Sequence, residues 1–363
     1  MPITVEEIAK LAGVSRATVS RVVNHRPNVR PEVRERVQQV IALHHYQPNR
    51  AAQSLATRQA HAIGLIVPNS FPLLFNDIFF PRLIQGIAEV CNTHDYIVTV
   101  ALTTSSSITS SSTASSTALV AEPERQVAQF ERILSSGAID GMIVANASLD
   151  DPLFPLLRDS RLPFVLVGRG PASADLSYVD VDNLLGGRLI TEYLIGLGHR
   201  RIGIVGGPLE RAAGQDRLQG YQQALDAAGI PFDHALTACG DFTEASGYAA
   251  ALRLLPARPT AIFACSDLMA LGVLRAAADA GLSVPDDLSV AGFDNFLAAT
   301  ATQPPLTTVA QPVIELGRAA AELLLELIHT REAPRARQCI LPVELVVRQS
   351  TRTLASTLAP EPA

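Results

Sequence analysis

Residues 4–24, which read TVEEIAKLAGVSRATVSRVVN, have the residue types and the spacing of a helix-turn-helix. Ala9 is small where a second helix would cross the first, and Gly13 can take the left-handed conformation of a sharp turn. Ser15 can cap the second helix, and Val19 would face the core. The polar side chains left on the outer face, where such a helix would meet DNA, are Arg16, Thr18, Ser20 and Arg21. The same spacing also fits a generic helical hairpin, so the elements that follow decide between the two.

The helical pattern continues into a third helix. Pro31 suits a first helical turn, and the helix is expected to run to about His44. The apolar residues that would cover the first two helices are Val33, Val37, Val40 and Ile41. Residues 47–57 favour a helix by composition but are too few to hold one alone in water, so we expect them to order only with DNA and a second chain. The sequence therefore predicts an all-α helix-turn-helix head at 1–46 and a hinge helix or linker at 47–60.

From residue 63 onward, short strands alternate with helices. The expected strands are 63–67, 96–102, 141–145, 164–167, 202–205, 261–265 and 288–292, and the expected helices are near 82–93, 122–136, 184–197, 215–228, 244–255 and 267–280. This alternation predicts parallel sheets covered on both faces, and its two consecutive series predict two Rossmann-like lobes. Because ligands bind at the carboxyl ends of such strands, a cleft between the lobes is the expected site.

Two segments do not follow this α/β pattern. Residues 103–117 are almost all Ser or Thr, which cannot bury enough apolar surface to order themselves. We interpret them as a surface insertion in preference to a phosphorylated regulatory loop. Residues 351–363 form a flexible tail whose large apolar residues are only Leu354 and Leu358. These are too few for a heptad bundle, so a dimer is expected in preference to a tetramer.

Length and composition limit the class of protein. The 363 residues suit two or three domains, and 48% hydrophobic residues support a sizeable core. No apolar run approaches the length of a membrane span, and the N-terminus lacks a secretion pattern. The cysteines lie far apart in the sequence, at Cys91, Cys239, Cys265 and Cys339. This spacing favours reduced thiols in a cytoplasmic protein over a disulfide framework or a zinc site.

The charge is divided unevenly along the chain. The net charge is −6, from 29 Lys and Arg against 35 Asp and Glu. Residues 1–60 hold nine basic and four acidic residues, or +5, which leaves 20 basic and 31 acidic residues, or −11, for the remainder. The basic end can neutralise phosphates, whereas the acidic body is not expected to wrap nucleic acid.

In this order of parts the chain resembles the LacI/GalR family of bacterial transcription repressors over residues 3 to about 350. The segments that carry the resemblance are IAKLAGVSRATVSRVVN, VRPEVRERVQQVI, YQPNRAAQSLA, IGLIVP, FFPRLIQGI, DGMIVA, VDVDNLLGG, LGHRRIGIVGGP, DRLQGY, SDLMALG, VAGFDN and PPLTTV. The resemblance implies a homodimer that binds a palindromic operator in double-stranded DNA, with a small effector between the lobes and no cofactor, metal or catalytic residue. It implies a periplasmic-binding-protein-like core at 61–350, with one lobe at about 61–180 and 294–323 and the other at about 181–293 and 324–350.

The same resemblance assigns the DNA contacts. Arg16, Ala17 and Arg21 match positions that read base edges in the major groove, where arginine can fork to guanine O6 and N7. The residues expected to bind phosphates and fix register are Thr4, Ser15, Thr18, Ser20 and Asn24. In the hinge, Leu55 matches a side chain that wedges into the minor groove, and Asn49 and Ala52 match positions close to the backbone and the groove floor. Gln53 stands where many relatives have Arg, so one phosphate contact is expected to be absent.

It also assigns the effector contacts. Arg217 matches an inward-pointing arginine that can fork to hydroxyls or a carboxylate, and Asp267 and Asp294 match acceptors for hydroxyl or ring NH groups. Either aspartate could instead cap a helix. The other expected contacts are Phe79, Phe80, Asn146, Arg211 and Phe242. The segment GPLER resembles the purine repressor around Arg211, but Ala213 replaces its threonine, so a sugar is favoured and a purine is kept as the alternative.

Two other classes of protein share parts of this pattern. A solute-binding protein or sensor would have the same two-lobed body, but it would carry a signal segment instead of residues 1–60. An α/β enzyme such as a sugar kinase or a hydrolase would need GxxxxGK[ST] or GxSxG at a strand end, and neither motif appears there. The sequence therefore favours a regulator, and relief of repression by the ligand is our default expectation.

Overall fold

The computed structural model describes residues 3–23, 27–46, 59–68, 77–102, 122–171, 175–330 and 336–354. The chain divides into two compact units, Met1–His61 and Ala62–Ala363. Each unit has its own hydrophobic core and is described by itself. The predicted hinge segment 47–57, the Ser/Thr-rich segment 103–117 and the last nine residues of the tail lie outside the described residues.

The first unit consists of three helices, α1 (Val5–Leu11), α2 (Arg16–Val23) and α3 (Pro31–Leu43). Its buried core is formed by Ile8, Ala9, Ala12, Val19, Val22 and Val37. Gly13 has φ +63° in the turn between α1 and α2, and the Oγ of Ser15 accepts a hydrogen bond from the backbone N–H of Thr18 at 3.1 Å. The predicted turn glycine, helix cap and buried Val19 are therefore confirmed.

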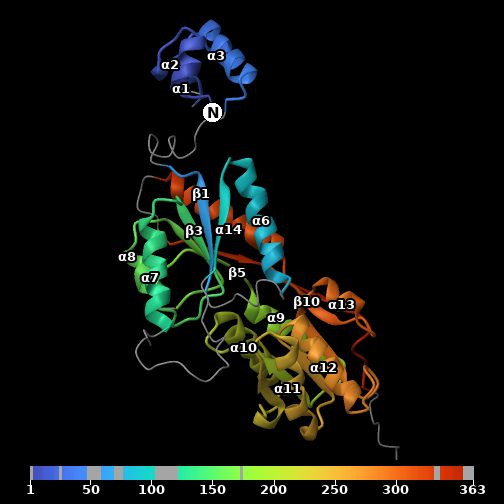
Figure 1. Cartoon of the computed structure of the whole chain (residues 1–363). Coiled ribbons are helices and arrows are strands. Elements are labelled where there is room, and N and C mark those ends of the chain that lie inside the picture. The colour runs from blue at the N-terminus through green and yellow to red at the C-terminus, as the bar shows by residue number, and fades with distance from the viewer. Residues whose placement is uncertain are drawn as a thin grey trace, which may run out of the picture. The chain divides into compact units, whose positions relative to one another are not determined.

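The first lobe of the second unit is a six-stranded parallel sheet. Its strands are β1 (Ala62–Val67), β2 (Ile97–Leu102), β3 (Gly141–Ala145), β4 (Phe164–Val167), β5 (Tyr178–Val181) and β11 (Gln338–Leu341), in the order β11-β5-β4-β3-β1-β2. Its helices are α6 (Phe79–Thr93), α7 (Glu122–Ser135), α8 (Leu153–Asp159) and α14 (Val313–His329). Figure 1 shows α7 and α8 on one side of the sheet and α6, which packs against α14, on the other.

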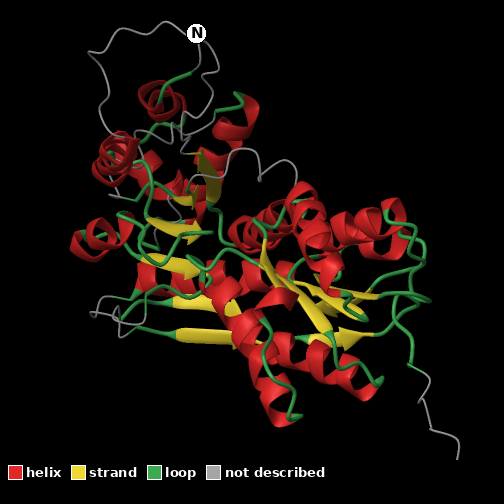
Figure 2. Cartoon of the chain, turned by 90° about the horizontal axis from the view of Figure 1, so that it is seen from below, coloured by secondary structure: helices red, strands yellow, loops and turns green. Residues whose placement is uncertain are grey.

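The second lobe repeats this plan with a strand of opposite direction at one edge. Its strands are β6 (Ile202–Gly206), β7 (Thr237–Cys239), β8 (Ala261–Ala264), β9 (Ser289–Asp294), β10 (Thr307–Ala310) and β12 (Glu344–Val346), in the order β12-β10-β9-β8-β6-β7, with β12 antiparallel to β10. Its helices are α9 (Asn183–Gly196), α10 (Ala212–Ala227), α11 (Glu244–Leu254), α12 (Asp267–Asp279) and α13 (Leu297–Ala301), with short 3₁₀ turns at His234–Leu236 and Leu255–Ala257. In Figure 2 the yellow strands form two groups, each enclosed by helices.

Three crossings join the lobes, and two of them lie elsewhere than the sequence predicted. The chain passes from β5 to α9, from β10 to α14, and from β11 to β12. Because β10 pairs with β9, residues 294–310 belong to the second lobe, and because α14 and β11 pack in the first lobe, residues 324–329 and 338–341 belong there. The predicted lobes at 294–323 and 324–350 are corrected accordingly. The strand signal of 307–310 is short, and only its pairing with β9 shows which lobe holds it.

Glycines set the spacing of the main helix pairs. A Cβ atom at Gly187 of α9 would lie 2.3 Å from the carbonyl oxygen of Arg217 in α10, and one at Gly220 would lie 2.2 Å from the carbonyl oxygen of Leu184. The α6–α14 and α11–α12 pairs have the same reciprocal arrangement, through Gly86 with Gly317 and Gly247 with Gly272. Backbones in direct contact leave no room for any side chain at these positions.

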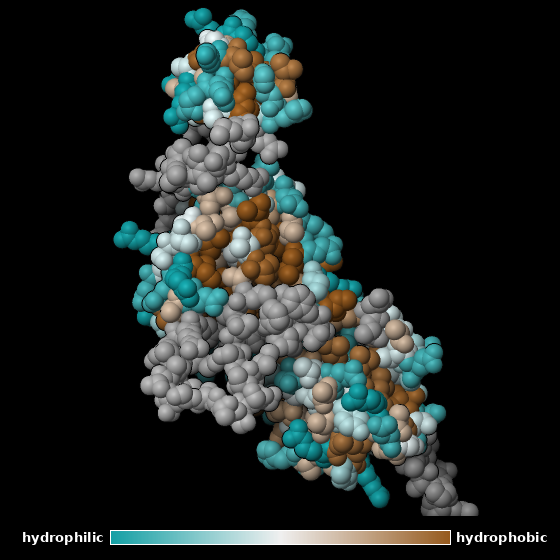
Figure 3. Space-filling model, viewed as in Figure 1, coloured by the Kyte–Doolittle hydropathy of each residue, from teal (hydrophilic) through white to brown (hydrophobic). Residues whose placement is uncertain are grey.

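The edge strand β2 of the first lobe carries exposed apolar side chains. Ile97 and Val100, which point to opposite faces of the sheet, keep 48% and 38% of their surface exposed. Figure 3 shows hydrophobic side chains gathered on the face of the first lobe that is turned to the viewer. An edge strand with exposed apolar residues is a surface on which another chain can pack.

Candidate functional site

The outer face of α2 carries the residues predicted to meet DNA. Arg16, Ala17, Ser20 and Arg21 are exposed, and Thr18 is half-buried. The Oγ1 of Thr4 accepts from the backbone N–H of Glu7 at 3.3 Å, and the Glu7 carboxylate accepts from Thr4 N–H at 2.8 Å, which forms a capping box. Thr4 and Ser15 thus fix the starts of the two helices whose crossing presents this face. Asn24, Asn49, Ala52 and Leu55 lie outside the described residues.

Arg16 forms a weak ion pair with Glu6. Its Nη1 lies 3.1 Å from Oε1 of Glu6 in α1, and the two side chains are 72% and 58% exposed. An ion pair this exposed to water is worth at most about 1 kcal/mol. The guanidinium can therefore exchange the carboxylate for a base edge or a phosphate at little cost.

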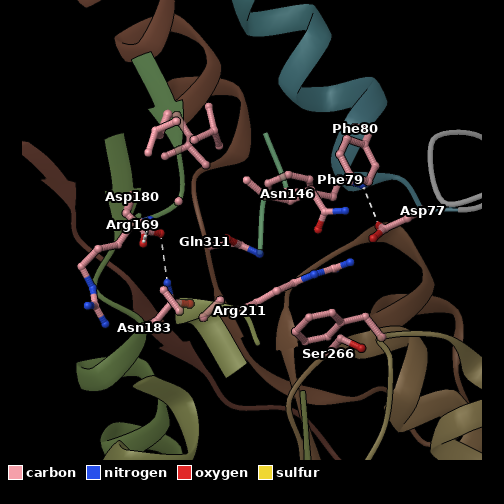
Figure 4. A pocket seen from close by; sticks show the side chains of 18 of the residues that line it. Asp77, Phe79, Phe80, Asn146, Arg169, Asp180, Asn183, Arg211, Ser266 and Gln311 are labelled. Carbon is pink, nitrogen blue, oxygen red and sulfur yellow. Dashed lines mark hydrogen bonds between the residues drawn. The ribbon is translucent and has the colours of Figure 1, made fainter. Parts of the chain in front are cut away.

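A cleft lies between the lobes of the second unit, at the carboxyl ends of strands from both sheets (Figure 4). Its space, including the part open to solvent, is about 1010 Å³. The charged and polar residues that line it are Asp77, Asn146, Arg169, Asp180, Asn183, Arg211, Arg217, Ser266, Asp294 and Gln311. The larger apolar residues that line it are Phe79, Phe80, Phe154, Leu166, Val167, Phe242, Leu268 and Leu316.

The floor of the cleft is a series of polar side chains that are hydrogen-bonded to one another. The Nε of Arg217 donates to Oδ1 of Asn183 at 2.8 Å, and its Nη1 donates to the carbonyl oxygen of Cys265 at 2.6 Å and lies 3.7 Å from Oδ1 of Asp294. Asn183 donates to Asp180, and Gln311 donates to Asp294 at 2.6 Å. Asn183 and Gln311 each sit at a crossing between lobes, so the floor is built where the chain changes sheets.

Several of these residues are held in uncommon backbone conformations. Asn146, Phe242 and Asp294 have φ values of +66°, +70° and +120°, and Asn295 has +60°. Left-handed conformations of residues other than glycine cost free energy and persist where the surrounding structure fixes them. Each of the first three follows a strand or a turn at the cleft, so the strain aims their side chains into it.

Burial alters the charge chemistry of the floor. Desolvation raises the pKa of Asp294 well above its usual range, although Arg217 opposes the rise. Desolvation likewise raises the pKa of Asp77 and raises that of Asp180 to about 6, against hydrogen bonds from the backbone N–H groups of Val181 and Arg169 that lower it. The Asp180 carboxyl of the cleft therefore changes its charge near pH 6.

This placement of Asp180 predicts a dependence of stability on pH. A carboxyl whose pKa is raised in the folded state stabilises the fold below its unfolded pKa, and this contribution is lost as the pH rises through the folded value of about 6. From pH 4 to pH 7 the unfolding free energy of the wild type should therefore fall by about 2 kcal/mol relative to Asp180→Asn. Urea denaturation at both pH values measures the difference, with the exposed Asp159→Asn as control. A gap that does not change with pH would contradict the placement.

Two contacts hold the lobes together beside the floor. Nη2 of Arg169, after β4 in the first lobe, lies 2.6 Å from Oδ1 of Asp216 in α10 of the second. The backbone N–H of Leu149 donates to the carbonyl oxygen of Glu210 at 2.7 Å. Both contacts involve the α10 region, which also carries Arg217, so closure of the lobes and the position of the floor are mechanically linked.

Seven of the eight predicted effector residues line the cleft, namely Phe79, Phe80, Asn146, Arg211, Arg217, Phe242 and Asp294. Asp267 does not, which corrects its prediction. Its side chain is fully buried below the floor, where Oδ1 accepts from Thr308 Oγ1 at 2.7 Å and Oδ2 accepts from the backbone N–H of Phe296 at 2.8 Å. Ser266, one residue earlier, caps α12 and faces the cleft instead.

Sequence reasoning missed Asp77, Arg169, Asp180, Asn183 and Gln311. Asp180 lies in β5 and Gln311 follows β10, two short strands that were not predicted. Polar residues directly after buried apolar runs, as in YVDVDN and TTVAQP, were the available signal.

No helix in the described part of the chain is both long and apolar enough to cross a bilayer. Within the same residues, no three His, Cys, Asp or Glu side chains converge on a point that could hold a metal ion.

Comparison with protein families gives two matches. Residues 4–49 match the family described as "Bacterial regulatory proteins, lacI family", and residues 191–351 match the periplasmic binding protein-like domain. Among curated relatives, the HTH-type transcriptional regulator CelR of Thermobifida fusca is 39% identical over 354 residues, which cover 96% of this chain and 98% of that protein. The HTH-type transcriptional repressor PurR of Escherichia coli is 34% identical over 338 residues, covering 92% and 93%.

Solved structures give the same result. The complex of the transcriptional regulator CelR with cellobiose has a TM-score of 0.72 at 36% identity and covers 96% of this chain and 99% of its own. The lac repressor dimer bound to operator and the anti-inducer ONPF has a TM-score of 0.81 at 28% identity, covering 97% and 100%. Both the helix-turn-helix and the two-lobed body are thus shared along nearly the full chain.

Proposed function

We propose, since the chain belongs to the LacI family of bacterial regulatory proteins, that this DNA-binding transcriptional regulator is a repressor. Its proposed effector is a sugar held in the cleft. The observation that carries the proposal is the make-up of the cleft, in which a polar floor faces aromatic side chains. Hydroxyl groups of a sugar can bond the floor while its C–H face packs on the rings. The relative that was solved with cellobiose supports a sugar of this kind.

A purine is the second candidate. Phe79, Phe242 and Arg211 line the cleft and could enclose a flat base, and one relative is the repressor PurR. Ala213 lines the same wall and offers only a methyl group. A methyl group cannot bond a ring nitrogen or a carbonyl oxygen, so this wall favours the sugar.

Regulation follows from the coupling of the cleft to the lobes. A ligand that prefers one arrangement of the lobes shifts the population of the whole chain, and DNA must alter the affinity for that ligand in return. We infer that the edge strand β2, with its exposed apolar side chains, packs against a second copy, so that each first lobe sets the spacing of the paired DNA-binding heads. The cleft is proposed to bind its ligand without transforming it, in the cytoplasm, where the operator is.

Selection of operators from a pool of palindromic duplexes tests the proposal. The full chain should enrich one palindrome, and neutral sugars added one at a time should change its affinity for that duplex. Fluorescence anisotropy at fixed salt measures both effects, because DNA affinity depends steeply on salt. Failure to hold any specific duplex would refute the regulator, whereas a response to hypoxanthine instead of any sugar would favour the purine.

The exposure of Arg16 predicts a specific loss of discrimination. Arg16→Ala should weaken operator binding by about 1–3 kcal/mol and relax the preference at one base pair, since a bidentate contact to guanine is lost. Arg36→Ala, an exposed change on α3, is the matched control. Titration against the operator and its single-base variants at several salt concentrations separates the possibilities. Equal weakening on all duplexes, with the salt slope lowered by about 1, would show that Arg16 binds phosphate instead.

A further inference from the structure

Two charged side chains of the cleft differ from the floor because their hydrogen-bonding capacity is not filled. Asp77 precedes α6 in the first lobe, and its Oδ1 accepts from the backbone N–H of Phe79 at 2.9 Å. The structure shows no partner among the described residues for its Oδ2. Arg211 stands at the start of α10 in the second lobe, and its buried Nε has no hydrogen-bond partner in the part of the chain that the structure describes.

The missing partner of the buried Arg211 Nε is costly for the free protein. A buried donor without an acceptor loses its hydration and gains nothing in return. Desolvation lowers the pKa of Arg211 and raises that of Asp77, because burial disfavours the charged form of each side chain. No ion pair joins these two residues in the described structure, although the Arg211 side chain extends toward Asp77 and Asn146 in Figure 4. Both groups line the cleft, so a molecule bound there can reach them.

We propose that Asp77 and Arg211 form a clamp across the cleft for two hydroxyl groups of one uncharged sugar. One hydroxyl donates to the free oxygen of Asp77, and the other accepts from Nε–H of Arg211. Because the two residues belong to opposite lobes, a ligand that satisfies both holds the lobes closed. This inference rests on the proposed sugar effector and adds to it the residue Asp77 and the exclusion of anionic ligands.

The charges of the cleft explain that exclusion. Three carboxylates, Asp77, Asp180 and Asp294, and three arginines, Arg169, Arg211 and Arg217, line it. Arg169 is engaged by Asp216, and Arg217 is engaged by Asn183, Cys265 and Asp294. Of the three arginines, only Arg211 has a buried nitrogen without a hydrogen-bond partner among the described residues, and a phosphate that reached it would also meet the Asp77 carboxylate. Phosphate sites normally offer several free donors, and like charges in a desolvated space repel strongly.

The aromatic residues around the clamp fit the same ligand. Phe79 and Phe80, two and three residues after Asp77, meet edge to face with ring centroids 5.3 Å apart. The Phe242 ring lies 5.8 Å from the guanidinium carbon of Arg217. These rings offer apolar surface beside the two charged groups. A pyranose can pack the C–H groups of its ring face against the aromatic side chains while its equatorial hydroxyls reach the charged groups.

Calorimetric titration of the full chain tests the clamp. The ligands are glucose, ribose and cellobiose, each compared with its phosphorylated counterpart, glucose 6-phosphate, ribose 5-phosphate or cellobiose 6-phosphate. We expect at least one neutral sugar to bind and its phosphorylated form to bind about 100-fold more weakly. Asp77→Asn keeps the size of the side chain and should lower affinity for the neutral sugar about 10- to 100-fold, as should Arg211→Leu.

A structural role and a contact role give different results in this series. Because Asp77→Asn removes the repelling charge, the ratio of neutral to phosphorylated affinity should shrink in this variant but not in Arg211→Leu. Asp159→Asn and Arg158→Leu, both exposed, are the matched controls and should leave every affinity unchanged. Retained operator binding shows that the variants are folded.

Several outcomes overturn the clamp. Tighter binding of a phosphorylated sugar, an unchanged affinity in Asp77→Asn, or an unchanged affinity ratio in that variant would each do so. If a neutral sugar binds and alters operator affinity in spite of these results, the proposed function stands and only the clamp fails. If no sugar binds while the operator is still recognised, the clamp and the sugar effector fail together, and the regulator remains.

Discussion

The Arg217→Met substitution is expected to destabilise the two-lobed core by about 3–5 kcal/mol, because it leaves a buried carboxylate without its counter-charge. The Arg217 and Asp294 side chains are only 6% and 8% exposed. The substitution also removes the donors to Asn183 and to the Cys265 carbonyl, so the floor of the cleft loses its central member. Urea denaturation followed by circular dichroism measures the stability, and effector titration should show no binding.

The pH dependence of this loss identifies its cause. Burial already raises the pKa of Asp294, and the loss of Arg217 removes the main opposing influence. Below the raised pKa the carboxyl takes up a proton and its burial costs less, so the destabilisation should be larger at pH 8 than at pH 5. The double variant Arg217→Met/Asp294→Asn should be more stable than Arg217→Met at pH 8. Equal losses at both pH values, with no rescue, would assign the effect to packing alone.

Gly187→Ala is expected to destabilise the core by about 3 kcal/mol, because its Cβ atom would overlap the backbone of the neighbouring helix. That atom would lie 2.3 Å from the carbonyl oxygen and 2.9 Å from the Cα of Arg217. Backbone atoms cannot rotate away as the end of a side chain can, so α9 and α10 must separate. Arg217 would move with α10, and the effector affinity should fall together with the melting temperature.

Gly196→Ala is the matched control on the same helix. A Cβ atom at Gly196 would meet nothing within 4 Å, and the residue does not have a left-handed backbone. Alanine should therefore be neutral or stabilise α9 by no more than about 1 kcal/mol, with effector affinity unchanged. If both variants melt like the wild type, the close approach of α9 and α10 is not as tight as described. If both are equally unstable, the cause lies in the helix and not in the crossing.

The sequence predicted the elements with strong local signals. The strands at 63–67, 141–145, 164–167 and 202–205 match β1, β3, β4 and β6 within a residue or two, since buried parallel strands read as unbroken apolar runs. It missed β5, β7, β10, β11 and β12, which have three or four residues each, the short helices α8 and α13, and α14, which is the longest of the described helices. Short strands at a sheet edge or a crossing depend on their pairing partners, which no local pattern contains.

The binding residues divide in the same way. Arg217 and Asp294 follow recognisable strand-to-helix patterns, and both line the cleft. Asp267 follows an equally clear pattern, yet it points below the floor because Ser266 takes the cap position and turns the next side chain inward. Asp77 comes from a segment with no periodic signal, and only the approach of the second lobe places it opposite Arg211.

By itself, the amino-acid sequence determined the basic head, the acidic α/β body and the family, because helix caps, turn glycines and apolar periods act between residues that are near one another in the chain. Tertiary structure alone decided which lobe holds residues 294–341, which carboxyl groups are buried together, and which donor and acceptor are left open. Those properties depend on desolvation and on distances between residues that are far apart in sequence, and both arise only when the two sheets are brought together by the three crossings.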